Sequence, residues 1–455
     1  MFLFPIAYIL IFILSVRSIL KKNIEGALLF LVAGLPIYTI SLSVTYMYGF
    51  AKWVPVLQSF KEIIILVFLG SILLNLKKKI HFHLVDKLVL GFLLYTLLYV
   101  LLPIGQNSIM NKLLAIKGLS FGILIYFAGR LFDPAKLYVN KYFHYICAVL
   151  IAATCLTLYE VITYRHIQTF SGYADYNYHY FNQDPSGSYG LSWTFEIESG
   201  RKRFASFFAN PLEFGSAVIL TTAVFVGLYT TNKNRLKIDP FGIIVIACIT
   251  LSIIFSLSRS YLITYFILLY VYALLARKKF ILRFVYACVS GAILYMIFFK
   301  GNDIKEYAIS TLNFTNPSSL GHLLAWLEGI TTIFQRPLGI GLGESGGRLS
   351  GVIGETVGGE NQFLIIGVQT GIISLTLYLW IYFAIIKNSW RWRNKLKGKE
   401  KKICIAILLI KIGFIIPSFT SELESYLYVS YMTWFLSGVF ISIISRKKDP
   451  LIQTG

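Results

Sequence analysis

Arginines at the edges of apolar segments are the first candidates for chemistry. Arg201 and Arg203 precede a long apolar run, in Arg201-Lys-Arg-Phe-Ala-Ser-Phe-Phe-Ala-Asn-Pro211, and Arg259 lies in the turn Ser256-Leu-Ser-Arg-Ser260. A guanidinium at such a boundary is costly and usually functional, and its planar fork binds phosphate oxygens in pairs. We therefore expect these arginines to bind a phosphate-bearing group. The alternative is that they reach toward phospholipid headgroups.

Two more arginines, Arg336 and Arg348, flank a glycine-rich stretch that begins Pro337-Leu-Gly-Ile-Gly-Leu-Gly343. Glycines let backbone N–H groups approach an anion closely. The stretch does not have the Walker spacing, because no Gly-Lys-Ser/Thr follows it. It predicts either an anion-binding loop or a tight turn after a helix.

Two residues are candidates for a general base. Glu360 is our first choice and His322 the second. A carboxylate near a membrane interface can have a raised pKa and act as a base, and the adjacent Asn361 could orient an acceptor hydroxyl. The alternatives are a charge at a helix start for Glu360 and an ordinary polar helix position for His322.

Aromatic residues crowd the segment before Arg201, and we expect Tyr178 and Tyr180 among them to offer flat faces to sugar rings. The alternative is an interfacial aromatic belt.

Asn210 is a further expected substrate contact. Glu422 and Glu424 could hold a divalent cation, but their spacing is common; we expect no metal site and no cofactor.

The elements that must position these residues are membrane-spanning helices. The chain has 455 residues, of which 56% are hydrophobic and 14% charged, whereas soluble domains carry about a quarter charged residues. Runs of about 20 apolar residues predict spanning helices. We expect an all-α polytopic membrane protein with about thirteen spans (12–14), near 2–20, 27–46, 60–76, 86–103, 113–132, 143–163, 204–229, 240–257, 260–276, 280–299, 363–386, 403–420 and 425–444.

The net charge of +21 reflects orientation in the membrane rather than a nucleic-acid partner. Every second loop is basic: the segments predicted to face the cytoplasm hold 27 Lys and Arg against 6 Asp and Glu, and the opposite segments hold 13 against 15. By the positive-inside rule this places the N-terminus outside and the C-terminus inside. All five cysteines fall in predicted spans, without metal-ligand spacing.

The chain reads as a single membrane domain, 1–455, with two long outward loops. These are 164–203, the third outward loop, and 300–362, the fifth. The fifth contains a predicted helix near 320–334 that Pro337 ends. Long loops on a helical scaffold are where function tends to lie.

Five short pieces of sequence, in this order and on the outer side, resemble the Wzy-type O-antigen polymerases and the related O-antigen ligases. They cover roughly 203–371, and the N-terminal spans match in character alone. Arg336 also precedes Gly347 by eleven positions, a spacing typical of arginine motifs in these loops. The pieces are Arg203-Phe-Ala-Ser-Phe-Phe-Ala-Asn-Pro211, Ser256-Leu-Ser-Arg-Ser260, Gly321-His-Leu-Leu-Ala-Trp326, Arg336-Pro-Leu-Gly-Ile-Gly-Leu-Gly343 and Glu360-Asn-Gln-Phe-Leu364.

The resemblance implies a GT-C-like glycosyltransferase of the bacterial inner membrane, facing the periplasm or exterior, that joins undecaprenyl-pyrophosphate-linked repeat units into O-antigen, capsular or exopolysaccharide. It implies no nucleotide sugar and no metal, a pyrophosphate held by Arg203 and Arg259, and a chain-length regulator and a flippase as possible partners besides membrane lipids. Two positions depart from the pattern. His322 stands where Arg is common, and Glu360 stands where ligases carry His, which favours a polymerase.

Two alternatives remain open. One is an O-antigen ligase that transfers glycan to lipid A core. The other, from a different class, is a flippase or transporter for the same lipid. A flippase needs no outer loop of about 60 residues, and transporters tend to bind substrate through broken helices in paired halves, of which the sequence shows no sign.

Overall fold

The computed structural model describes residues 1–23, 25–75, 81–197, 200–298, 309–310, 313–346 and 357–448. The secondary structure of this part of the chain is helical, apart from two isolated bridges, Glu196 with Lys202 and Thr230 with Leu236. The helices are α1 (Leu3–Leu20), α2 (Gly26–Leu29), α3 (Tyr38–Met47), α4 (Val54–Leu74), α5 (Leu84–Leu101), α6 (Ile109–Leu131), α7 (Val139–Thr163), α8 (Ile167–Phe170), α9 (Tyr173–Phe181), α10 (Pro211–Tyr229), α11 (Pro240–Ser256), α12 (Arg259–Ala276), α13 (Lys279–Phe298), α15 (Pro317–Gln335), α16 (Gln362–Trp392), α17 (Gly398–Gly413), α18 (Pro417–Thr420) and α19 (Leu427–Lys448).

The predicted all-α polytopic membrane protein is confirmed. Eleven helical segments of the described residues are long and apolar enough to cross a membrane. The other two predicted spans are helices as well: α11 has 17 residues and α13 has 20. The total of thirteen spans therefore stays a prediction.

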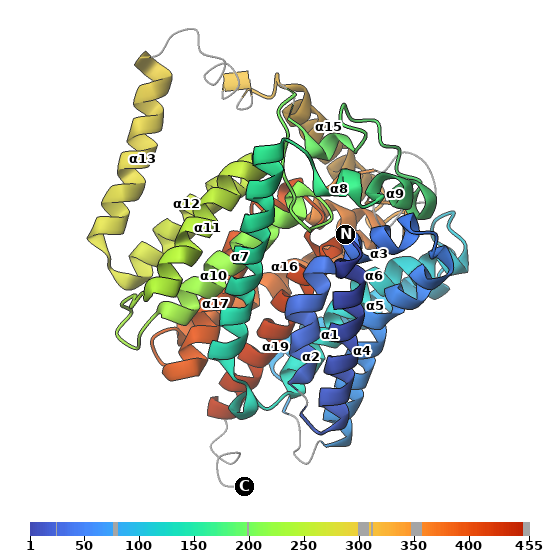
Figure 1. Ribbon diagram of the computed structural model, residues 1–455. Helices are drawn as coiled ribbons and strands as arrows, with labels where there is room; N and C mark the ends of the chain where they lie inside the picture. The colour runs from blue at the N-terminus through green and yellow to red at the C-terminus, as the bar shows by residue number, and fades with distance from the viewer. Residues whose placement is uncertain are drawn as a thin grey trace.

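The most buried spans, among them Gly26–Met47 at 72%, form the centre of the bundle, because most of their side chains are apolar on every face. In α10 and α19, 94% of the apolar window is buried, and in the segment Gly398–Thr420 that includes α17, 72%. Peripheral helices such as α1 and α12 bury only 22% and 28% and present the rest outward. Figure 1 shows α13 standing apart at the edge of the bundle.

Several predicted boundaries shift by five residues or more, and the start of α10 has a clear physical reason. The span predicted over 204–229 begins only at Pro211, and 204–210 is a buried non-helical turn. Proline at the first helical position and the Asn210 side chain, which accepts a hydrogen bond from the Glu213 N–H at 2.8 Å, set this start. Apolar composition alone cannot distinguish a buried turn from a spanning helix.

The basic loops gather at one end of the bundle, the end of the C-terminus, whereas α8, α9 and α15 lie at the other (Figure 1). Arg446 pairs with Asp133 and Lys447 with Glu400, each at 2.6 Å. Lys401 donates to the Asn232 carbonyl at 2.7 Å. The candidate residues of the long loops lie at the end opposite to these contacts, and the orientation of the protein in the membrane stays a prediction.

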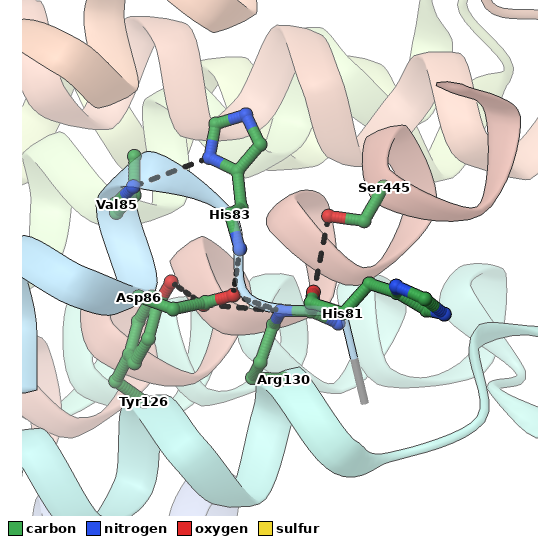
Figure 2. A network of polar contacts seen from close by, with 7 residues as sticks. All are labelled: His81, His83, Val85, Asp86, Tyr126, Arg130 and Ser445. Carbon is green, nitrogen blue, oxygen red and sulfur yellow. Dashed lines mark hydrogen bonds and ion pairs between the residues drawn. The ribbon is translucent and has the colours of Figure 1, made fainter. Parts of the chain in front are cut away.

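A buried ion pair holds α5 to α6 near the basic end (Figure 2). Arg130 Nε lies 3.0 and 2.9 Å from the two carboxylate oxygens of Asp86, which is fully buried. Asp86 also accepts the Tyr126 hydroxyl at 2.6 Å and the His83 N–H at 2.7 Å. Arg130 donates further to the His81 carbonyl at 2.7 Å. These contacts compensate the cost of removing two charges from water.

Asp86→Ala should lower the free energy of unfolding by about 3–5 kcal/mol, because it leaves the Arg130 guanidinium buried without its counter-charge. Asp133→Ala is the matched control: it breaks an Asp–Arg pair whose two side chains are each 39% exposed, so about 0–1 kcal/mol is expected. Denaturant titration of the purified protein in detergent micelles measures both. Equal losses in the two variants would contradict the assigned role of the buried pair.

Candidate functional site

Arg259 lies at the meeting point of two helix starts. It is the first residue of α12, and its guanidinium donates to the hydroxyls of Ser318 and Ser319, each at 3.3 Å, in the first turn of α15. The side chain is half-buried. N-terminal ends of helices carry unpaired N–H groups and partial positive charge. This junction can therefore attract and hold an anionic group.

Arg203 reaches the same turn from a distant part of the chain. Its Nε donates to the Ser256 carbonyl at 3.3 Å, and the neighbouring Phe204 N–H donates to the Phe255 carbonyl. Arg203 thus lies against the segment that leads from α11 into Arg259. The structure brings together the two arginines that the sequence marks as the strongest phosphate ligands.

A buried carboxylate on α7 fastens the segment that follows Arg203. Glu160, fully buried, accepts the N–H groups of Ile167 and Ser206, each at 2.9 Å. Gln168 donates to the carbonyls of Ser206 and Phe208 at 2.8 and 2.9 Å. Ser206 has a φ of 53°, so this turn is held in an uncommon conformation by its surroundings. Glu160 and Gln168 are positioning residues for Arg203.

His322 lies on α15 one turn beyond the serines that Arg259 contacts. The ring is half-buried. Burial, together with the positive charge of Arg259 nearby, holds the pKa of His322 below its ordinary value. The imidazole is consequently neutral near pH 7 and can accept a proton, which is what a general base requires.

Glu360 lies beside the same part of α15. Gly359 approaches Ala325 so closely that a Cβ on the glycine would be 2.8 Å from the Ala325 Cβ. The Glu360 side chain is exposed. The Tyr261 hydroxyl lies within electrostatic range of both Glu360 and Arg203. Arg259 thus begins α12 and Arg203 contacts the turn before it, while His322 and Glu360 lie along the adjacent part of α15.

Arg336, which the sequence places beside the glycine-rich stretch, lies apart from these residues. It follows the last residue of α15, fourteen positions after His322, which is about 21 Å along a helix. It lines a separate cleft of about 430 Å³ with Gly105 and Glu344. The Glu344 Oε1 accepts the N–H groups of Gln106 and Asn107 at 2.8 and 3.1 Å. The cleft thus carries one basic and one acidic side chain, and the catalytic role predicted for Arg336 stays a prediction.

The glycine-rich stretch does not offer the backbone N–H groups of Ile340, Gly341 and Gly343 to an anion. Ile340 and Gly341 donate to the carbonyls of Val368 and Gln369 at 2.8 and 3.0 Å, and Gly343 donates to the Gln369 side chain at 3.0 Å. These N–H groups are already occupied inside the protein. The tight-turn alternative is therefore the correct one for 339–343.

The partner of this stretch is a break inside α16. Gly371 has φ 79° and ψ −179°, which no helix contains. The break frees the carbonyls of Val368 and Gln369, and the Ile372 N–H donates instead to the Pro337 carbonyl at 2.9 Å. Backbone groups at membrane depth must find partners inside the protein, and residues 337–341 supply them.

Other predicted residues have structural roles or lie elsewhere. The Oδ1 of Asn361 accepts the N–H groups of Phe363 and Leu364 at 3.0 and 3.2 Å and caps α16, as Asn210 caps α10. Arg201 is exposed. Arg348 lies outside the described residues.

The predicted aromatic platform is not beside the arginines. Tyr180 donates to the Ala51 carbonyl at 3.2 Å and contacts the Tyr46 ring, while Tyr178 is 59% exposed. Both belong to α9, which packs on α3, on a different side of the bundle from α12 (Figure 1). The contacts of Tyr180 are with Ala51 and Tyr46 rather than with Arg203 or Arg259, so contact of either tyrosine with a sugar ring stays a prediction.

Comparison with protein-family models and with curated proteins finds no match to this chain.

Sequence reasoning missed several residues of the site. Glu160 could have been found in the sequence, because it is an acidic residue inside a predicted span and such residues are usually functional or paired. Ser318, Ser319 and Tyr261 gave no signal, because their role depends on which segments meet.

Glu424 is not available to a cation: it accepts hydrogen bonds from Tyr378 at 2.6 Å, from Trp434 at 2.9 Å and from Ser430.

Gly371→Ala should destabilise the protein by at least about 2 kcal/mol, because a Cβ there would be 2.4 Å from the Pro337 carbonyl oxygen and the backbone conformation is accessible essentially to glycine alone. Gly70→Ala, in the interior of α4 with no atom within 4 Å of the added Cβ, should instead stabilise by about 0.5–1 kcal/mol. Denaturant titration in detergent micelles compares the two. A neutral Gly371→Ala would show that the break does not depend on this glycine.

Proposed function

We propose that the chain polymerises undecaprenyl-pyrophosphate-linked oligosaccharide repeat units into O-antigen, capsular or exopolysaccharide at the outer face of the bacterial cytoplasmic membrane. It would act as a GT-C-like glycosyltransferase that needs neither metal nor nucleotide sugar. The observation that carries the proposal is the convergence of Arg203 and Arg259 at the start of α12, with His322 and Glu360 beside them. Two guanidiniums and two helix starts suit a pyrophosphate, and the neighbouring bases suit an acceptor hydroxyl.

In the proposed reaction the donor is the growing chain on undecaprenyl pyrophosphate, and the acceptor is a sugar hydroxyl of a new lipid-linked unit. A base removes the hydroxyl proton as the oxygen attacks the anomeric carbon of the donor. The bond from that carbon to the pyrophosphate oxygen breaks, and the pyrophosphate leaves with the polyprenyl chain. Arg203 and Arg259 would stabilise the negative charge that develops on it. A single displacement gives inversion at the anomeric carbon.

The structure gives the two candidate bases different settings. His322 is half-buried, and burial and the charge of Arg259 lower its pKa, so the imidazole is neutral near pH 7. It lies near Arg259, which is proposed to bind the pyrophosphate. Glu360 is exposed and within electrostatic range of Tyr261. A base must lie within hydrogen-bond reach of the hydroxyl that it deprotonates. These settings keep both residues as candidates and make His322 a stronger one than its sequence context suggested.

The ligase alternative is less favoured because Glu360 stands where ligases carry His. The transporter alternative gains one observation, the break in α16, since transporters often bind substrate at broken helices. Here, however, residues 337–341 already occupy the carbonyls of Val368 and Gln369. Cells that lack a polymerase should accumulate single lipid-linked units on the outer face of the membrane, and cells that lack a flippase should accumulate them on the inner face.

The proposed setting is a multi-pass protein whose site faces the periplasm or exterior, as the alternation of basic loops along the sequence favours. The substrates would arrive through the membrane after a flippase has turned them over, and a chain-length regulator would be a further partner. A nucleic-acid partner is not part of the proposal.

Arg203→Ala and Arg259→Ala should each abolish polymer while the protein still inserts and folds. Losing a charge-assisted contact to a buried pyrophosphate should cost about 2–5 kcal/mol, by analogy with buried charge pairs. Lysine in either position keeps the charge without the planar fork and should retain part of the activity. The measurement is the polymer ladder formed from purified lipid-linked units in excess EDTA, at equal protein.

The control is Arg235→Ala, an exposed arginine of a basic loop at the other end of the bundle, which should leave the ladder unchanged. A normal ladder in Arg203→Ala or Arg259→Ala would exclude that arginine from catalysis. Activity that vanished in EDTA and returned with magnesium would contradict the metal-independent reaction.

Glu360→Gln and His322→Gln separate the two bases. Removal of the true base should slow polymer formation by about two to four orders of magnitude while lipid-linked units still bind. If His322 is the base, activity should persist below pH 6.5, the ordinary pKa of histidine, because the lowered pKa keeps the imidazole neutral there and protonation stops the reaction only at lower pH. Rate against pH for both variants tests this. Full activity in both would leave the proposed mechanism without a protein base.

A further inference from the structure

Helix α15 carries a stripe of large apolar side chains that no other part of the described structure covers. Its members recur at intervals of four, three, seven and four residues, which is the spacing of one helix face. They are Leu320, Leu324, Leu327, Phe334 and Leu338, just past the helix end, with exposed fractions of 41%, 56%, 53%, 76% and 58%. An exposed apolar face of this extent marks an interaction surface.

The opposite face of α15 is the one that faces the protein. Ile333 and Gly329 are buried. A Cβ added to Gly329 would lie 3.0 Å from the Gly358 Cα. Ile333 packs in a cluster with Leu364 and Val368 of α16. His322 lies on this inner side. The orientation of α15 about its axis is therefore determined by packing, and the stripe faces away from the bundle.

The C-terminal end of α15 is held at the depth of a membrane-spanning helix. Pro337 accepts the Ile372 N–H at 2.9 Å, and Ile372 lies ten residues into α16, about 15 Å from its start. Ile372 and Ile373 are themselves 44% and 47% exposed on that spanning helix. The stripe thus continues at Leu338 into a surface that already belongs to the membrane.

We propose that α15 is a re-entrant, interfacial helix whose apolar stripe lies against the acyl chains of the bilayer. The occupant is lipid because the stripe is continuous with a spanning surface and because its exposed fractions match those of lipid-facing positions on undoubted spans, such as Leu10 at 53% and Leu94 at 55%. Water is disfavoured, because five large apolar side chains would leave most of this surface hydrated. This inference does not depend on the proposed function.

The consequence is that the fifth outward loop is partly a membrane element. Lipid on the outer face of α15 places His322, on the inner face of that helix, and Arg259, which contacts its first turn, at the membrane boundary. A lipid-linked substrate can reach this position by lateral diffusion. A loop raised above the membrane would instead require the headgroup to leave the bilayer.

Site-directed spin labelling tests the placement. A nitroxide amino acid is inserted by amber suppression at Leu324, Leu327 or Phe334, so that the five native cysteines are retained, and the full chain is reconstituted in phosphatidylethanolamine–phosphatidylglycerol vesicles. Collision with oxygen, which concentrates in the bilayer, is compared with collision with a water-soluble nickel chelate. Leu94 on α5 is the lipid reference, and the exposed Asp184 is the aqueous reference.

Lipid contact predicts oxygen collision rates within about twofold of those at Leu94 and nickel collision rates at least about fivefold below those at Asp184, at all three positions. High nickel accessibility would show that the stripe faces water and would overturn the proposal. Low accessibility to both reagents, with dipolar broadening between labels, would show a second copy of the chain on the stripe and would overturn it as well. Since all three side chains point outward, labelling should not prevent folding, and the three positions test the proposal independently.

Discussion

A polypeptide inside a membrane has no water to satisfy its backbone, and this constraint organises the functional end of the molecule. α16 breaks at Gly371, which frees two carbonyls and redirects one N–H group. The segment 337–341 fills the gap and is thereby drawn down among the spanning helices. Because this segment directly follows α15, the position of the whole helix depends on the break. The glycines serve this close approach rather than a ligand.

Placing α15 in turn assembles the candidate site. Its first turn carries the serines that contact Arg259, and its inner face carries His322. Arg203 arrives from the third outward loop, fastened by Glu160 of α7 through backbone N–H groups. The candidate residues thus come from segments far apart in the sequence, and contacts with other segments of the chain hold them in place. Arg336, at the other end of α15, belongs to a different cleft.

Much of the fold could be predicted because a bilayer imposes simple rules. Long apolar runs must be helices, and eleven of the predicted spans are recovered as such. The helix before Pro337 was also predictable, since proline ends helices. The start at Pro211 was missed because a buried turn and a spanning helix have the same composition. Arg203 and Arg259 could be found in the sequence from the cost of placing a charge at a membrane boundary. The sequence did not show that Arg336, Tyr178 and Tyr180 lie apart from these two arginines.

The sequence by itself determined that the chain is an all-helical membrane protein, that its loops alternate in charge, and which residues are costly enough in their setting to be candidates for function. These properties depend on each residue and its neighbours in the chain, and on the uniform solvent that a bilayer provides. Only the tertiary structure decided which candidates meet, that 339–343 closes a broken helix, and that one face of α15 is left for lipid. Those outcomes depend on which distant segments satisfy each other's backbone groups, and local composition holds no record of that choice.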